Sequence, residues 1–210
     1  PSQMVSFGTS GHRGSSFNGS FNEMHIASTA QAICEYRSSS NITGPLFLGF
    51  DTHALSEAAF RTALEVFAAN DIEVIIHAKD EYTPTPVISF LILEYNQSRR
   101  KGLADGVIVT PSHNPPQDGG FKYNPWHGGP ADVDATGWIQ NRANQLMNSA
   151  TTDIKRTSYE KARRVSTTHA QDFITPFVEA LSQVVDMEII QKQGIRMGVD
   201  PMGGSGVHYW

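Results

Sequence analysis

Short, wholly apolar runs alternate with amphipathic segments along the first half of the chain. The apolar runs predict buried strands, and the segments with apolar residues three or four positions apart predict helices. The predicted strands are Leu46–Phe50, Ile72–His77 and Gly106–Thr110. The predicted helices are Glu23–Arg37 with Asn22 as its N-cap, a segment capped by Ser56, and Val87–Tyr95. This alternation predicts an α/β fold, a sheet with helices on both faces, in which ligand sites lie at the carboxyl ends of strands.

Two segments lack this pattern and are predicted to be loops. Residues 8–19 are polar and glycine-rich, and residues 111–130 contain five prolines. A further helix is expected at Thr136–Met147. Catalytic and binding residues are often carried by loops that a rigid scaffold positions, so both segments are candidates for function.

The chain divides into three parts by composition. Residues 1–150 form the α/β domain, residues 151–170 are a polar linker, and residues 171–210 begin a second, similar domain that is incomplete. That last part predicts a helix at Phe173–Val185, a strand at Ile195–Asp200 and a glycine turn. A strand and a glycine turn normally lead into a helix, so we expect the chain to be part of a longer protein.

Composition narrows the class of protein. Of the 210 residues, 39% are hydrophobic and 18% are charged, which is typical of a globular chain. The net charge of −5 does not favour a nucleic-acid partner, and no apolar run is long enough to cross a membrane. Cys34 is the single cysteine, so no intrachain disulfide forms, and we expect a cytoplasmic location.

The segment Thr110–Pro116 is the most informative loop, because it follows directly on a predicted buried strand. Its prolines keep the turn from becoming a helix and hold the Ser112 hydroxyl at the strand's carboxyl end. A serine hydroxyl is a weak nucleophile that needs a neighbouring base or cation. His113 is adjacent in sequence, and Lys122 is able to fold back over the serine. An ordinary proline-rich turn is the alternative.

A second candidate is Thr9-Ser10-Gly11-His12-Arg13-Gly14. The guanidinium of Arg13 matches phosphate oxygens, and the glycines on both sides let backbone N–H groups approach an anion. Asp51, after another predicted strand, is either a ligand or the cap of the next helix. The sequence contains no phosphate-binding P-loop, no nucleophile elbow and no His-Glu-x-x-His motif, and a serine hydrolase built on Ser112 and His113 is disfavoured.

Taken together, the loops resemble one family. Thr110-Pro111-Ser112-His113-Asn114-Pro115 resembles the active-site serine loop of the α-D-phosphohexomutase superfamily, and the segment 7–14 resembles its N-terminal motif. Gly120-Phe121-Lys122-Tyr123-Asn124-Pro125 is similar to the bacterial-type phosphoglucomutase branch. Segment 199–206 is similar to the opening of that family's second domain.

This resemblance implies an isomerase of carbohydrate metabolism that interconverts glucose 1-phosphate and glucose 6-phosphate through a bisphosphorylated sugar. Its implied cofactors are Mg²⁺ and glucose 1,6-bisphosphate as activator, and its partners are hexose phosphates. Ser112 is implied to carry the phosphoryl group and to bind Mg²⁺ through a phosphate oxygen, together with aspartates beyond residue 210. The implied catalytic residues are Ser112, His113, Lys122 and Arg13. The implied phosphate-binding residues are Thr9, Ser10, His12, Arg13, Asn114 and Lys122. Either Lys122 or His113 serves as general base, and the sequence does not choose between them.

The departures from the family are as informative as the matches. The Asp-Gly-Asp-x-Asp-Arg metal loop and the sugar-recognition loop do not occur in these 210 residues. His53 stands where many relatives carry arginine. We therefore expect the 210-residue chain to be inactive alone. The alternative is a non-catalytic phosphosugar-binding or regulatory module that keeps the first domain's fold. The sequence does not indicate an oligomeric state.

Overall fold

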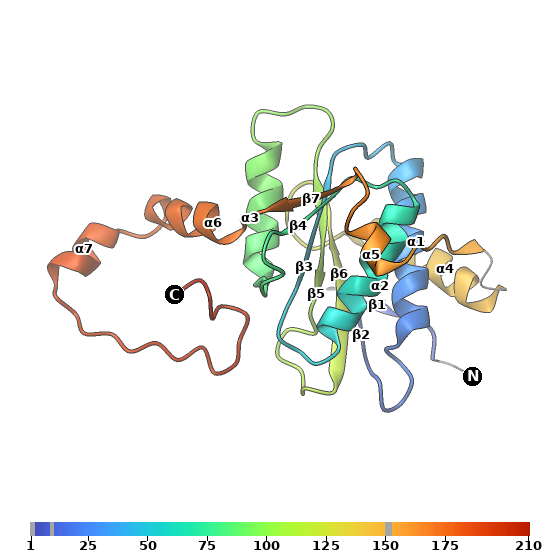
Figure 1. Ribbon diagram of the computed structural model, residues 1–210, viewed down its shortest axis with the longest axis horizontal. Helices are drawn as coiled ribbons and strands as arrows, with labels where there is room; N and C mark the ends of the chain where they lie inside the picture. Colours follow the sequence, from blue (N-terminus) through green and yellow to red (C-terminus); the bar gives the residue numbers. More distant parts are fainter. Residues whose placement is uncertain (1–2, 9–10, 150–152) are drawn as a thin grey trace.

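The computed structural model describes residues 3–8, 11–149 and 153–210 (Figure 1). Within these residues one sheet of seven strands has the order β1-β2-β6-β5-β3-β4-β7. The strands are β1 (Phe7–Gly8), β2 (Gly11–Ser15), β3 (Leu46–Phe50), β4 (Val74–His77), β5 (Asp105–Val109), β6 (Asp118–Asn124) and β7 (Thr168–Gln171). The helices are α1 (Glu23–Ser39), α2 (Ser56–Ala69), α3 (Thr85–Asn96), α4 (Val133–Asn148), α5 (Tyr159–Ala162), α6 (Ile174–Ala180), the 3₁₀ turn η2 (Leu181–Gln183) and α7 (Met187–Lys192).

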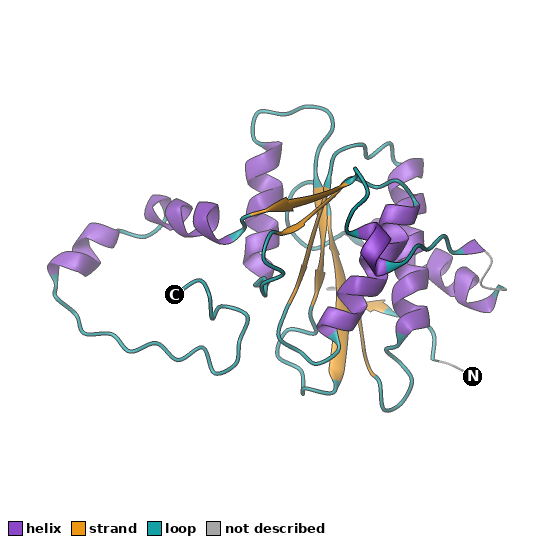
Figure 2. Cartoon of the chain, viewed as in Figure 1, coloured by secondary structure: helices purple, strands orange, loops and turns teal. Residues whose placement is uncertain are grey.

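Helices cover both faces of the sheet, which confirms the predicted fold class (Figure 2). Helices α1, α2 and α4 enclose the larger core on one face, and α3 covers the smaller core on the other. Asn22 caps α1 as predicted, accepting hydrogen bonds from two backbone N–H groups. Ser56 is the first residue of α2 rather than its cap, which is Leu55.

The centre of the sheet is parallel. Strand β3 pairs in parallel with both β4 and β5, and all five of its residues are buried. A strand that is covered on both faces reads as a continuous apolar run, which is why these strands were predictable. The parallel alignment brings the carboxyl ends of β3 and β5, with the residues after Phe50 and Val109, to the same edge.

The prediction that residues 111–130 form only a loop is wrong, because they contain β6. This strand pairs antiparallel with β5 on one side and with β2 on the other. Two of its residues are Gly119 and Gly120, and glycine is uncommon in strands, so the sequence gives only a weak signal for a strand here. The strand forms because neighbours on both sides supply its hydrogen-bond partners, which local sequence does not record. Likewise, residues 8–19 were predicted as loop but contribute part of β1 and all of β2.

Residues 151–170, predicted as a linker, contribute α5 and most of the edge strand β7. Strand β7 pairs in parallel with β4, so the sheet continues to Gln171. Three of the four residues in β7 are exposed, and a polar edge strand gives no apolar signal in the sequence. The division of the chain at residues 150 and 170 remains a prediction.

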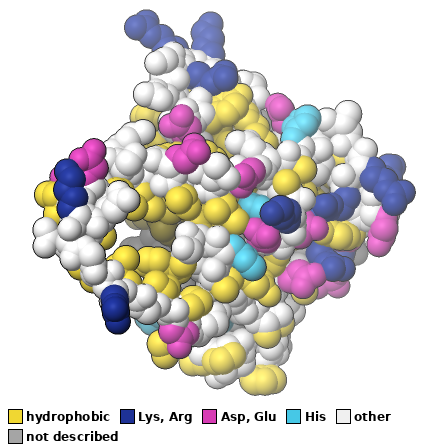
Figure 3. Space-filling view, turned by 60° about the vertical axis from the view of Figure 1, so that its left-hand side comes forward, with side chains coloured by type: hydrophobic (Ala, Val, Ile, Leu, Met, Phe, Trp, Pro, Cys, Tyr) yellow, Lys and Arg dark blue, Asp and Glu magenta, His cyan; other side chains and the backbone are white. Residues whose placement is uncertain are grey.

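The last part of the chain departs from the prediction. Helix α6 ends at Ala180, and Ile195–Asp200 is irregular instead of forming a strand. Its alternating apolar residues stay exposed, with Ile195 at 58%, Met197 at 69% and Val199 at 47%. A strand requires a neighbour for its backbone groups, and this segment pairs with no described strand. Figure 3 brings this part forward and shows hydrophobic side chains spread over its surface.

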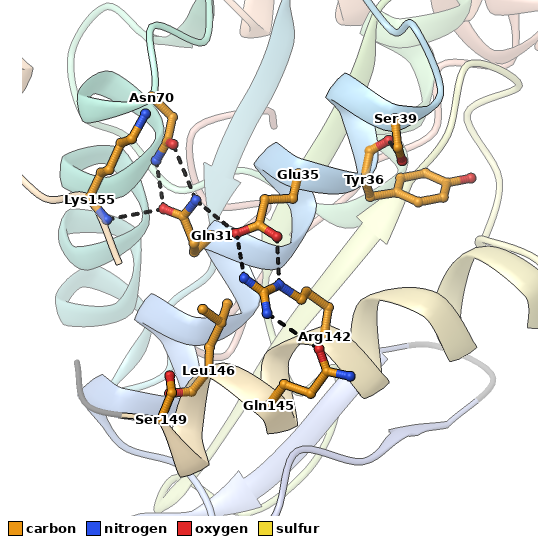
Figure 4. Close-up of polar contacts among 10 residues, drawn as sticks. All are labelled: Gln31, Glu35, Tyr36, Ser39, Asn70, Arg142, Gln145, Leu146, Ser149 and Lys155. Atoms are coloured by element: carbon orange, nitrogen blue, oxygen red, sulfur yellow. Dashed lines mark hydrogen bonds and ion pairs between the residues drawn. The ribbon is translucent and has the colours of Figure 1, made fainter. Parts of the chain in front are cut away.

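A polar network ties the helices of the larger face together (Figure 4). Arg142 on α4 donates from Nε to Glu35 Oε2 of α1 at 2.6 Å, and a second N–H reaches Oε1 at 3.2 Å. Gln31 of α1 exchanges two hydrogen bonds with Asn70 at the end of α2. The backbone N–H of Lys155 also donates to Gln31. These contacts hold α1, α2 and α4 in fixed positions relative to one another on this face of the sheet.

Candidate active site

The loop between β5 and β6 holds Ser112 in a strained conformation. Its φ of +74° lies in the left-handed region, where residues other than glycine are uncommon. The backbone N–H of Ser112 donates to Thr110 Oγ1 at 2.9 Å, which fixes the turn. The side chain of Ser112 is exposed at the edge of the sheet. Backbone strain of this kind persists only where the surroundings impose it, and it concentrates at functional sites.

Lys122 of β6 lies against this hydroxyl. Its Nζ donates a hydrogen bond of 2.5 Å to Ser112 Oγ, although the residue is only 8% exposed. Burial, followed by the charge of Arg13, lowers the pKa of Lys122 below its usual 10.5, and Asp51 acts in the opposite direction. The sequence suggested that Lys122 folds back over the serine, and the structure brings these two groups together.

Glycine makes this approach possible. A Cβ on Gly120 would lie 2.2 Å from the Thr110 carbonyl oxygen, closer than any side chain tolerates. Gly11 has a φ of +98°, and a Cβ there would lie 2.3 Å from the carbonyl oxygen of Phe121. Both positions need glycine so that β2 and the serine loop can pack against β6.

Arg13 supplies a second cation beside the serine loop. It lies on β2 directly across from Gly120, and its side chain is exposed. Arg13 is close enough to lower the pKa of Lys122, so the two cations share one region. A hydroxyl placed beside two cations suits an anionic group such as a phosphoryl group.

His12 has a different surrounding from the one expected. It is 2% exposed and stacks on His25 with a centroid distance of 5.1 Å. Its Nε2 donates to the Ser20 carbonyl oxygen at 2.8 Å, and its Nδ1 accepts from the Ser6 N–H at 3.2 Å. Burial lowers the pKa of His12. Both ring nitrogens are engaged inside the fold, so this geometry does not fit direct contact with phosphate.

Two of the remaining expected residues, Asn114 and His113, lie on the serine loop itself. Asn114 donates from Nδ2 to Asp118 Oδ2 at 3.0 Å, which closes the loop on itself. His113 is exposed on the loop. Thr9 and Ser10 lie outside the described residues.

Sequence reasoning left the role of Asp51 and His53 open, and the structure gives both a definite place. Asp51 Oδ1 accepts from the Ser56 hydroxyl at 2.6 Å and from the His53 backbone N–H at 3.0 Å. His53 Nδ1 lies 2.8 Å from Asp51 Oδ2, and its Nε2 lies 2.9 Å from the Asn114 carbonyl oxygen. The signal in the sequence was an Asp and a His just after a buried strand.

Asp51, His53 and Ser112 line one cleft of about 530 Å³ at the carboxyl edge of the sheet. The cleft is lined by residues 51–54, Ser112, Pro116 and residues 201–205. Its size suits a small phosphorylated molecule.

The described residues do not make a magnesium site on their own. Mg²⁺ prefers several oxygen ligands in octahedral geometry, and no group of three or more His, Cys, Asp or Glu side chains in the described ranges is arranged to hold a metal. The Asp51 carboxylate lines the cleft, but both of its oxygens are engaged by His53 and Ser56. The Ser112 hydroxyl lies in the same cleft, where a phosphoryl group on it would present further oxygens.

The fold and the site define an α/β domain that carries a rigid serine loop beside two cations. Residues 4–150 match the family described as phosphoglucomutase/phosphomannomutase, alpha/beta/alpha domain I. The chain belongs to this family.

Similarity to individual proteins is consistent with this family membership. The chain is 58% identical over 208 residues to the phosphoglucomutase of Komagataeibacter xylinus, a match that covers 99% of this chain and 38% of that protein. The open form of the exocytosis-sensitive phosphoprotein pp63/parafusin, a phosphoglucomutase from Paramecium, has a TM-score of 0.78 at 20% identity. That superposition covers 100% of this chain and 41% of the other.

A putative phosphomannomutase from Thermus thermophilus has a TM-score of 0.70 at 23% identity, covering 90% of this chain and 38% of that one. The two structural likenesses establish the fold. In each of these three comparisons the chain spans well under half the length of its relative. Within the described residues, no helix combines the length and apolar character that a membrane span requires.

Proposed function

We propose that the protein containing these residues is a phosphoglucomutase that interconverts glucose 1-phosphate and glucose 6-phosphate. Ser112 carries the phosphoryl group, and a bisphosphorylated glucose is the intermediate. The observation that supports this most directly is the hydrogen bond from Lys122 Nζ to Ser112 Oγ, because phosphoryl transfer depends on positioning and charge neutralisation. The 58% identity to a phosphoglucomutase favours glucose phosphates as substrates.

The transfer step assigns a role to each nearby group. The hydroxyl of the bound sugar phosphate attacks phosphorus, and the bond between phosphorus and Ser112 Oγ breaks. Lys122 donates its proton to the departing serine oxygen and recovers it when Ser112 is rephosphorylated. Its lowered pKa makes this exchange easier near neutral pH. Arg13 neutralises charge on the phosphoryl oxygens, and His113, exposed on the serine loop, is a candidate to accept the sugar hydroxyl's proton.

Other parts of the proposal concern groups outside these residues. Phosphoglucomutases generally depend on Mg²⁺, and we propose that Ser112 contributes one phosphate oxygen to it while carboxylates beyond residue 210 supply the rest. Glucose 1,6-bisphosphate would act as activator by phosphorylating Ser112. Because the chain covers 38% of its K. xylinus relative, we expect no turnover by these 210 residues alone. A cytoplasmic location is supported by a relative from Mesembryanthemum crystallinum named as cytoplasmic phosphoglucomutase, 26% identical over 159 residues.

The test is direct conversion of glucose 1-phosphate to glucose 6-phosphate by the complete protein, followed by ³¹P NMR with Mg²⁺ and glucose 1,6-bisphosphate present. Mannose 1-phosphate serves as the comparison substrate. We expect conversion of the glucose ester to be the faster of the two. Absence of conversion of both esters would refute the proposal, and faster conversion of the mannose ester would refute its substrate.

A further inference from the structure

His53 connects two strands at the active edge of the sheet. It lies three residues beyond the end of β3, and its ring reaches the Asn114 carbonyl oxygen in the loop after β5. Asn114 is two residues from Ser112, so this contact ties the neighbouring strand to the strained turn that presents the hydroxyl. His53, Asp51 and Ser112 line the same cleft.

The partners of His53 determine its charge. Ring atom Nε2 lies 2.9 Å from a carbonyl oxygen, which only accepts hydrogen bonds. Ring atom Nδ1 lies 2.8 Å from an oxygen of Asp51, which also only accepts when it is ionised. A neutral imidazole has one N–H, so it satisfies one of these contacts and leaves the other unmade. Both are made when the ring is an imidazolium with two N–H groups.

The surrounding electrostatics favour the same state. Burial acts to lower the pKa of His53, but its bonds to the Asn114 carbonyl and to Asp51 outweigh burial and raise it. Asp118, at the start of β6, adds to this effect. Asp51 is in turn held by the Ser56 hydroxyl at 2.6 Å, so the carboxylate does not rotate away from the ring.

We infer that His53 is a positioning residue: as an imidazolium anchored on Asp51, it holds the Asn114 carbonyl and thereby fixes the Ser112 turn in its strained conformation. His53 acts through Asn114 and does not touch the reacting oxygen. The inference rests on the proposed function for its effect on turnover, whereas its effect on the loop is independent of that function. Misplacing a reacting group by about 1 Å lowers rates by up to about a hundredfold, so the loop's position matters.

The test uses the complete protein and the variants H53Q, D51N, H53Q/D51N and H53R. Glutamine offers one uncharged donor group, whereas arginine stays charged and has several N–H groups. H169Q is the matched control, because His169 on β7 also pairs with a carboxylate, Glu73, at 3.3 Å but lies on the edge strand of the sheet.

Amide hydrogen exchange of the loop reports its position without reference to activity. The Ser112 and Asp118 amides are both hydrogen-bonded within the loop, the second to the Pro115 carbonyl oxygen at 2.9 Å. We expect H53Q and D51N each to speed their exchange about tenfold, the factor for losing a hydrogen bond to a charged group. The double variant should be no faster than either single one, because the two residues act as a unit. H53R should lie closer to wild type than H53Q.

Kinetics provide the second readout. We expect H53Q to lower kcat about ten- to a hundredfold with KM changed less than about twofold, and H169Q to match wild type. A wild-type protein without mutase activity would refute the proposed function, while the exchange experiment would still decide the role of His53. Unchanged exchange at Ser112 and Asp118 in H53Q, or additive effects in the double variant, would overturn the inference. Ring ¹⁵N shifts showing a single N–H on His53 at neutral pH would overturn its charged form.

Discussion

The ammonium of Lys122 donates a 2.5 Å hydrogen bond to the hydroxyl of Ser112, ten residues earlier in the chain. The two residues belong to opposite sides of a tight connection, with Ser112 in the loop after β5 and Lys122 on the returning strand β6. The loop is stiffened by prolines, and Gly120 lets it lie directly on β6. Neither group has to reorganise to meet the other, which is what transfer of a charged group requires.

Replacement of Ser112 tests whether it carries the phosphoryl group. Ser112→Ala removes the only atom proposed to bond phosphorus, so kcat of the complete protein should fall roughly a thousandfold or more. Peptide mass spectrometry should find a phosphoryl group on Ser112 of the native protein and none in the variant. Ser149→Ala, at the end of α4, is the control and should behave as wild type. Phosphoryl incorporation elsewhere in Ser112→Ala with retained turnover would contradict the assignment.

The pKa of Lys122 predicts a pH dependence. Because burial and Arg13 lower this pKa below 10.5, the ammonium loses its proton at a lower pH than an exposed lysine does. The charged form is the one that donates to the departing serine oxygen, so kcat should fall as pH rises through the lowered pKa. Lys122→Arg stays protonated, so its remaining activity should show no such alkaline fall.

Lys122→Met should lose roughly a hundred- to a thousandfold in kcat at every pH, as when one stabilising donor is removed. Lys155→Met is the control, since that side chain is exposed beside α1 and outside the cleft. Measuring kcat over neutral and alkaline pH shows whether the charged form of Lys122 is the active one. An activity that rises with pH through the Lys122 titration would show that the neutral amine acts instead.

Gly120 and Gly137 form a matched pair for testing backbone approach. A Cβ at Gly120 would meet the Thr110 carbonyl oxygen at 2.2 Å, whereas a Cβ at Gly137 in α4 meets nothing within 4 Å. Gly120→Ala should therefore lower the free energy of unfolding by about 1–3 kcal/mol. Gly137→Ala should raise it by about 0.5–1 kcal/mol, because alanine favours the helix. Urea denaturation measures the free energy of unfolding of both variants. Equal effects of the two substitutions would contradict the conclusion that the close backbone approach at Gly120 requires glycine.

Arg37 in the last turn of α1 and Asp105, the first residue of β5, form a buried ion pair at the end of β5 away from the serine loop. Arg37 is 2% exposed and Asp105 1% exposed, and the Tyr123 hydroxyl also donates to Asp105 at 2.6 Å. Arg37→Met leaves a buried carboxylate without its cation, which should cost about 3–5 kcal/mol of stability. Lys192→Met breaks the exposed pair with Glu188 and should leave stability almost unchanged. A small loss in Arg37→Met, measured by urea denaturation, would show that the pair contributes little.

The amino-acid sequence by itself determined the central architecture and pointed to the loop that carries the candidate site. Leu46–Phe50 reads as a strand because burial on both faces requires an unbroken apolar run. Asn22 marks the start of α1 because its side chain bonds the first free N–H groups. Ser112 stood out because a polar, proline-stiffened loop directly follows a buried strand. All of these signals are local, so they are present before any tertiary contact forms.

Only the tertiary structure decided which distant residues meet. Strand β6 has weak local signals and exists because β2 and β5 pair with it. His12 looked like a loop residue of the phosphate site, yet it is packed in the core because its strand aligns it beneath His25 and Ser20. The contact between His53 and the Asn114 carbonyl joins residues that are 61 positions apart in the chain. Such relationships depend on strand register and packing, which join parts of the chain that the sequence keeps apart.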